Sequence, residues 1–316
     1  MLTLQSWLKT MLLAIGLIVA SLVGAVGAFA QAAVAPVDTA EQEKEADAKK
    51  ATSEYLRITK LDNGKPDSME TSIVRFEGPA GSKYAGRVVD LIGVVHIGQK
   101  EYYEQLNQRF ADYDRVLYEL VAPEGTTVSK EQAGEVRGPL GAMQLGMKDI
   151  LNLDFQLEHI DYDAKNFRHA DMSPEEFAAD MAERGDSVMK MVFRMLGSGM
   201  ATQAAAEPAA SDTALLFALF APDRARRMKQ IMASQFEDME IATAAMADAT
   251  GKSTIITERN AKAFSVLADE LQRGSRKVAV FYGAGHLPDM ADRLRDDFQM
   301  KKTQTEWFQA WDLQKN

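Results

Sequence analysis

The chain has 316 residues, enough for one large domain or two small ones, and a formal net charge of -10 at pH 7. An acidic protein repels phosphate backbones, so nucleic acid is not expected as a partner. The absence of cysteine excludes thiol catalysis, disulfides and cysteine-ligated metal sites. Any metal must therefore be held by histidine, aspartate and glutamate side chains.

Residues 1–30 have the features of an export signal. Met11–Ala30 is apolar or small, Lys9 is the only charge, and the segment ends in Ala28-Phe29-Ala30, the small-x-small pattern of a signal-peptidase site. We expect a cleaved signal peptide and a periplasmic or secreted protein. The alternative is an uncleaved helix that associates with the membrane, because about 20 apolar residues can just span a bilayer.

The folded domain is predicted to cover 54–316. It follows a charged, flexible tether at 31–53, which is rich in Ala, Glu, Lys and Asp and has no aromatic residue. Apolar and alternating patterns then predict strands at 55–60, 71–77, 86–95 and 115–121, with a helix at 101–113. The last two strands and the helix between them form a βαβ unit with the usual right-handed crossover.

Helical patterns dominate the next part of the chain, from 140–160 onward, interrupted by a short extended piece at 167–171. Ser173-Pro174-Glu175-Glu176 is typical of a helix start, and about 172–250 is interpreted as a Met- and Ala-rich helical insertion over the sheet. A strand at 277–282, a helix at 288–298 and a strand at 302–313 complete the chain. The predicted fold class is α/β, with a mixed, largely parallel central sheet.

Two strands run into the same short motif, Gly-x-x-His, at Gly93–His96 and again at Gly283–His286. Each motif is followed by a helix, so both histidines are expected at the edge of the sheet where parallel strands end and ligands bind. Gly93, Gly283 and Gly285 suit tight turns that need backbone freedom. The sequence therefore predicts two strand–Gly-x-x-His–helix units that share one site.

Glu119 is a carboxylate in an apolar strand, which we expect to neighbour the first Gly-x-x-His strand. A buried charge needs an ion-pair partner or a metal. His96, Glu119 and His286 together make a plausible divalent-metal site with open positions. Alternatively, His96 or Glu119 acts as the general base instead of as a metal ligand.

The sequence gives weaker evidence that other polar residues belong to the site. Arg259 could clamp an oxyanion or a substrate carboxylate, but taken alone it is better explained as a helix-surface charge. His169 and Asp171 could supply a further metal ligand or support one, although Asp171 could also cap the next helix. His159 is explained by a solvated helix face.

Four segments, in their order along the chain, resemble the TraB/GumN (TraB/PrgY/GumN) family, which is related to the TIKI metalloproteases and, more distantly, to erythromycin-esterase-like proteins. They are Gly93-Val94-Val95-His96, Tyr118-Glu119-Leu120, Glu258-Arg259-Asn260 and Gly283-Ala284-Gly285-His286-Leu287-Pro288. The resemblance covers about 86–298, and the segments 155–162 and 167–171 look like bacterial GumN-type members. Asp289 departs from the pattern, because many relatives have glycine there.

The resemblance implies one active site made by His96, Glu119, Arg259 and His286, with Asn260 in support. In TIKI-like members this is a peptidase site that depends on Mn or Co; Zn is an alternative here. We therefore expect an exported, divalent-metal-dependent hydrolase of peptide bonds. The alternatives are a metal-independent hydrolase of small esters and a non-catalytic module that binds a peptide or another partner. The substrate would be a peptide or a small molecule, and the sequence does not determine the oligomeric state.

Overall fold

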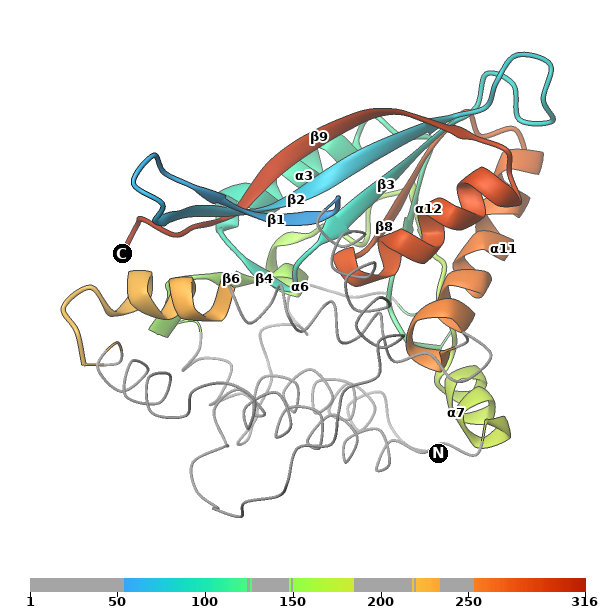
Figure 1. Ribbon diagram of the computed structural model, residues 1–316. Coiled ribbons are helices and arrows are strands. Elements are labelled where there is room, and N and C mark those ends of the chain that lie inside the picture. The colour runs from blue at the N-terminus through green and yellow to red at the C-terminus, as the bar shows by residue number, and fades with distance from the viewer. Residues whose placement is uncertain are drawn as a thin grey trace, which may run out of the picture.

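A seven-stranded mixed sheet forms the centre of the protein in the computed structural model (Figure 1), which describes residues 54–123, 126, 148, 150–184, 218, 220–233 and 253–316. The strands are β1 (Leu56–Lys60), β2 (Pro66–Glu77), β3 (Val88–Val94), β5 (Arg115–Tyr118), β7 (Phe167–His169), β8 (Lys277–Gly283) and β9 (Lys301–Asp312). The predicted export signal, the tether and most of the predicted helical insertion lie outside the described residues.

The strand order is β1-β2-β3-β8-β5-β7, and β9 pairs with the free side of β2. β3, β8, β5 and β7 run parallel to one another, whereas β2 is antiparallel to β1, β3 and β9. The predicted α/β class with a mixed, largely parallel sheet is therefore confirmed. β3 and β8 are buried along most of their length, which explains their almost continuous apolar sequences.

Helices pack on the sheet through apolar stripes with helical spacing. α3 (Lys100–Phe110) buries Tyr102, Tyr103, Leu106 and Phe110, and α12 (Leu287–Asp296) buries Leu287, Met290, Ala291 and Leu294. Figure 1 shows α12 and α11 (Arg259–Gln272) side by side against the sheet, with α3 behind it in this view.

Short elements connect these layers. β4 (Ile97–Gly98) pairs with β6 (Asp154–Phe155), α6 (Gln156–His159) follows directly, and α7 (Pro174–Glu183) begins with the predicted capping box at Ser173. A π-helix, η1 (Thr254–Glu258), leads into α11, and a 3-10 turn, η2 (Ala284–His286), leads into α12. Within the described residues, none of the helices has the length and apolar character needed to cross a membrane.

The structure corrects four expectations about the segments near the site. β8 lies between β3 and β5, so the strand before Glu119 does not neighbour the first Gly-x-x-His strand. β5 ends at Tyr118, which places Glu119 just beyond the strand. β4 separates His96 from its helix, and 154–155 is extended where a helix was expected.

The expected reason for the motif glycines is also wrong. In the part of the chain that the structure describes, the glycines with positive φ are Gly64, Gly81, Gly86 and Gly274, none of which belongs to a Gly-x-x-His motif. Gly93 is required by close packing instead, because an added Cβ would lie 3.2 Å from Leu287 Cδ2 and 3.4 Å from the Ser72 carbonyl oxygen. At Gly285 an added Cβ would meet nothing within 4 Å.

Candidate functional site

The loop that carries His96 is held through its backbone. Four of its carbonyl groups accept hydrogen bonds from side chains or backbone of other elements. The pairs are Gly93 with the Tyr102 hydroxyl at 3.2 Å, Val95 with the Tyr103 hydroxyl at 3.0 Å, His96 with the Gln156 N–H at 2.9 Å, and Ile97 with Trp311 Nε1 at 2.6 Å. The loop is therefore fixed before any ligand arrives, which is what a preorganised site requires.

His96 is exposed, and among the residues that the structure describes its ring is hydrogen-bonded through Nδ1 alone. Nδ1 lies 2.9 Å from Gln156 Oε1, and Gln156 Nε2 donates to the Tyr162 hydroxyl at 2.7 Å. The amide thus turns its oxygen toward His96, so Nδ1 carries the hydrogen of the neutral ring. Nε2 keeps its lone pair and can accept a proton or bind an ion.

Glu119 reaches across the end of β8. Its Oε2 accepts the backbone N–H of Gly283 at 2.7 Å, and its Oε1 accepts Arg259 Nη2 at 2.6 Å and lies 3.6 Å from His286 Nε2. Burial opposes its ionisation, but the charge of Arg259, followed by His286, His96 and the Gly283 N–H, outweighs burial. The pKa of Glu119 is therefore well below its ordinary range, and the side chain is a carboxylate at neutral pH.

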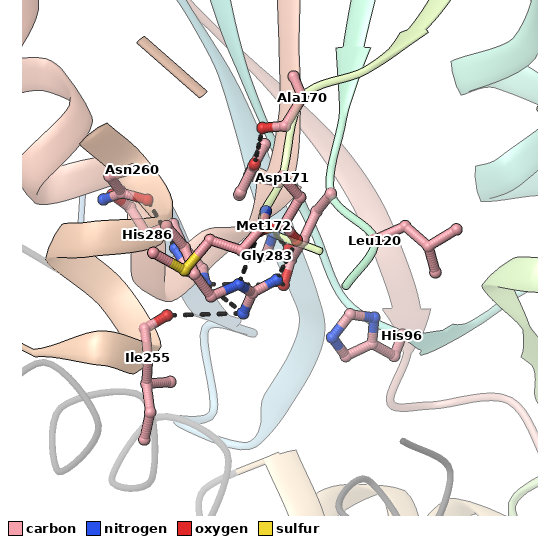
Figure 2. A network of polar contacts seen from close by, with 12 residues as sticks. His96, Leu120, Ala170, Asp171, Met172, Ile255, Asn260, Gly283 and His286 are labelled. Carbon is pink, nitrogen blue, oxygen red and sulfur yellow. Dashed lines mark hydrogen bonds and ion pairs between the residues drawn. The ribbon is translucent and has the colours of Figure 1, made fainter. Parts of the chain in front are cut away.

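Arg259 is buried where η1 passes into α11, and it uses all five of its N–H groups (Figure 2). Nε and Nη2 donate to the two oxygens of Asp171 at 3.0 and 2.6 Å, and Nη2 also donates to Glu119. Nη1 makes the two longest contacts, each 3.5 Å, to the Ile255 carbonyl oxygen and His286 Nε2. The prediction that Arg259, taken alone, is a charge on the surface of a helix is wrong.

His286 is buried at the start of α12 and is oriented by Asn260. Nδ1 lies 2.7 Å from Asn260 Oδ1, while Asn260 Nδ2 donates to the His286 carbonyl oxygen and to Asp289 Oδ2. Burial lowers the pKa of His286 to about 4, against the opposing effect of Glu119. The ring is therefore neutral at pH 7. Asp289 anchors Asn260 and also accepts Arg293 Nε at 2.7 Å.

The predicted supporting residues divide into two groups. Asp171 belongs to the site: it is 1% exposed and pairs with Arg259, so its role is more than a local cap. His169 does not turn toward Arg259, because its Nε2 lies 2.5 Å from the Leu120 carbonyl oxygen. His159 is not on a solvated face as expected, since its ring stacks on Tyr103.

The electrostatics of the buried group leave one negative charge in excess. The guanidinium of Arg259 lies between the carboxylates of Glu119 and Asp171, while His286 is neutral at pH 7. His96 is not hydrogen-bonded to this group in Figure 2, but it lowers the pKa of both Glu119 and His286. The excess negative charge of the group would stabilise an additional cation here.

The residues do not fit a preformed metal centre made by His96, Glu119 and His286. Arg259 lies against both Glu119 and His286, where a shared ion would have to bind. Among the residues that the structure describes, the one group of three with ligand atoms within 4.8 Å of one another is Asp154, Glu158 and His159. There the ammonium of Lys148 already lies 2.6 Å from both carboxylates.

No protein-family model, curated protein or solved structure matches the chain. The TraB/GumN resemblance therefore stays a prediction. The sequence assigned no role to Gln156 or Tyr162, although both lie in the segment 155–162 that resembles GumN-type proteins. Gln156 meets His96 across 60 residues of chain, and a contact over that separation leaves no local pattern in the sequence.

Proposed function

We propose that the protein is a hydrolase of ester or amide bonds in which His96 is the general base that activates water. The observation that carries the proposal is the exposed His96 ring, whose Nδ1 is held by Gln156 and whose Nε2 has no hydrogen-bond partner among the described residues. General bases work best when their pKa lies near the working pH. Glu119, with its strongly lowered pKa, and His286, with a pKa of about 4, are both weak bases at pH 7.

Arg259 would stabilise the negative charge that develops on the substrate carbonyl oxygen. Its Nη1 is the guanidinium nitrogen with the weakest contacts, both at 3.5 Å, so a substrate oxygen could replace them. Glu119 and Asp171 hold the rest of the guanidinium in place, and His286 positions Nη1. From the N-terminal sequence alone, we further propose that the protein is exported or anchored at the membrane.

A metal-dependent peptidase is the second candidate function. Two observations favour it: the excess negative charge of the buried group, and the engagement of Nδ1 of both histidines by an acceptor oxygen, since metal-binding histidines usually donate their second ring N–H to an acceptor. It requires Arg259 to leave Glu119 and His286, so that an ion such as Mn, Co or Zn can approach them.

One set of assays separates these candidates. Hydrolysis of p-nitrophenyl esters and of fluorogenic peptides is measured for the wild type, His96→Ala and the matched control His159→Ala, with and without a strong chelator. The proposal predicts about a 10²–10⁴-fold loss in His96→Ala, little change in His159→Ala, and activity that survives chelation. Activity that is lost on chelation and restored by one metal would favour the second candidate. Hydrolysis no faster in the wild type than in His96→Ala would contradict both and leave a binding module.

A further inference from the structure

The two Gly-x-x-His histidines are held by the same arrangement, although they come from different strands. Each ring places Nδ1 against the oxygen of a side-chain amide, Gln156 at 2.9 Å for His96 and Asn260 at 2.7 Å for His286. Each amide uses its NH2 group elsewhere, on the Tyr162 hydroxyl for Gln156 and on Asp289 for Asn260. We propose that Gln156 is the positioning residue that fixes the tautomer and direction of His96. The catalytic consequence rests on the proposed function, whereas the tautomer itself does not.

Gln156 holds His96 at two points at once. Its side chain engages the ring, and its backbone N–H donates to the His96 carbonyl oxygen at 2.9 Å. The pairing of Ile97 with Phe155 sets the register that brings these groups together. Gln156 is only 6% exposed, whereas His96 is exposed, so the amide is a rigid support for a ring that would otherwise rotate freely.

The direction of the amide decides which ring nitrogen is available. With its oxygen on Nδ1, Gln156 selects the tautomer in which Nδ1 carries hydrogen and Nε2 is a proton acceptor. The hydroxyl of Tyr162, on a side chain that is also buried, accepts the amide hydrogen and completes the chain His96–Gln156–Tyr162. Without the amide, the exposed ring would adopt the tautomer with hydrogen on Nε2 that neutral histidine prefers in water, and this form cannot take a proton at Nε2 from a nucleophilic water.

The test compares three variants of the full-length protein. Gln156→Met removes the hydrogen-bonding groups but keeps the length of the side chain, and Gln156→Glu keeps an acceptor for Nδ1. Asn107→Ala is the matched control, because Asn107 also holds this segment, through the His159 carbonyl oxygen at 2.8 Å and the Asp161 N–H at 3.2 Å, without touching His96. Nitrogen NMR of histidine-labelled protein reports the tautomer directly, and the chain has 4 histidines to assign.

We expect the hydrogen of His96 on Nδ1 in the wild type, in Gln156→Glu and in Asn107→Ala, and mainly on Nε2 in Gln156→Met. Hydrolysis should fall about 10–100-fold in Gln156→Met, as is typical when the partner of a functional histidine is removed, and should largely recover in Gln156→Glu. The inference is overturned if Gln156→Met keeps the wild-type tautomer, or if Asn107→Ala shifts it equally. A tautomer that shifts as expected in a protein that hydrolyses nothing would support the positioning role and contradict the proposed function.

Discussion

Replacing Arg259 by leucine should destabilise the protein by about 3–5 kcal/mol at pH 7, the usual cost of removing one partner from a buried ion pair. The cost arises from the carboxylates that remain. The side chain of Asp171 is 0% exposed and that of Glu119 is 13% exposed, so neither can regain much hydration when the guanidinium is lost. Leucine also offers no donor to replace the five N–H contacts.

The loss of stability in Arg259→Leu should become smaller as the pH falls. In the wild type, the pKa of Glu119 is below its unfolded value, so Glu119 contributes stability above about pH 4.3 that is lost as the pH falls through the folded pKa. In Arg259→Leu, burial without the positive charge raises the pKa of Glu119, which then takes up a proton in the folded state at higher pH. The difference in unfolding free energy between the two proteins should therefore shrink from pH 7 to pH 5.

Urea denaturation at the two pH values measures this difference. Arg273→Leu is the matched control, because Arg273 follows the same helix and pairs with Asp269 while its side chain is 67% exposed; its loss should stay below about 1 kcal/mol. Arg259→Lys keeps the positive charge but not the planar contacts, so its loss of stability should lie between those of the wild type and Arg259→Leu. It replaces Arg259→Leu in the measurement if the leucine variant does not fold. A loss in Arg259→Leu no larger than in Arg273→Leu, or one that is the same at both pH values, would refute the reasoning.

Three further predictions concern single positions. Gly93→Ala should lower stability by about 1–3 kcal/mol because its Cβ meets packed atoms, whereas Gly285→Ala should change it little; equal thermal midpoints for the two variants would count against this. Ser173→Ala should cost about 1 kcal/mol by removing the capping box of α7, an effect that denaturant titration would detect and Ser173→Asn should largely reverse. His286 should stay neutral in an NMR titration of the folded protein until about pH 4. Because the unfolded state binds this proton first, His286 should lower the stability of the protein as the pH falls from about 6.5 toward 4. A midpoint near 6.5 in the folded state would be inconsistent with the structure.

Much of the fold follows from local sequence patterns. The strands at β3 and β8 are continuous apolar runs because both faces are buried, and α12 shows the spacing of a helix with one buried face. Ser173 and Glu176 form a capping box within four residues of one another, so its signal is local as well. The parallel strand ends bring His286 and Glu119 together because such ends meet at one edge of a sheet.

The sequence by itself thus determined the α/β class and the main strands, and it predicted that Glu119 and His286 reach the same sheet edge. Only the tertiary structure decided that β8 separates the two flanking strands, that Gly93 serves packing, and that Arg259 is buried among carboxylates. Arg259 reaches Glu119 across 140 residues and Asp171 across 88. Ion pairs and hydrogen bonds over such separations impose no periodicity on the chain. The local sequence around Arg259 therefore does not distinguish a buried side chain from an exposed one. Gln156 is hidden for the same reason, since its contact with His96 exists only after β4 and β6 have paired.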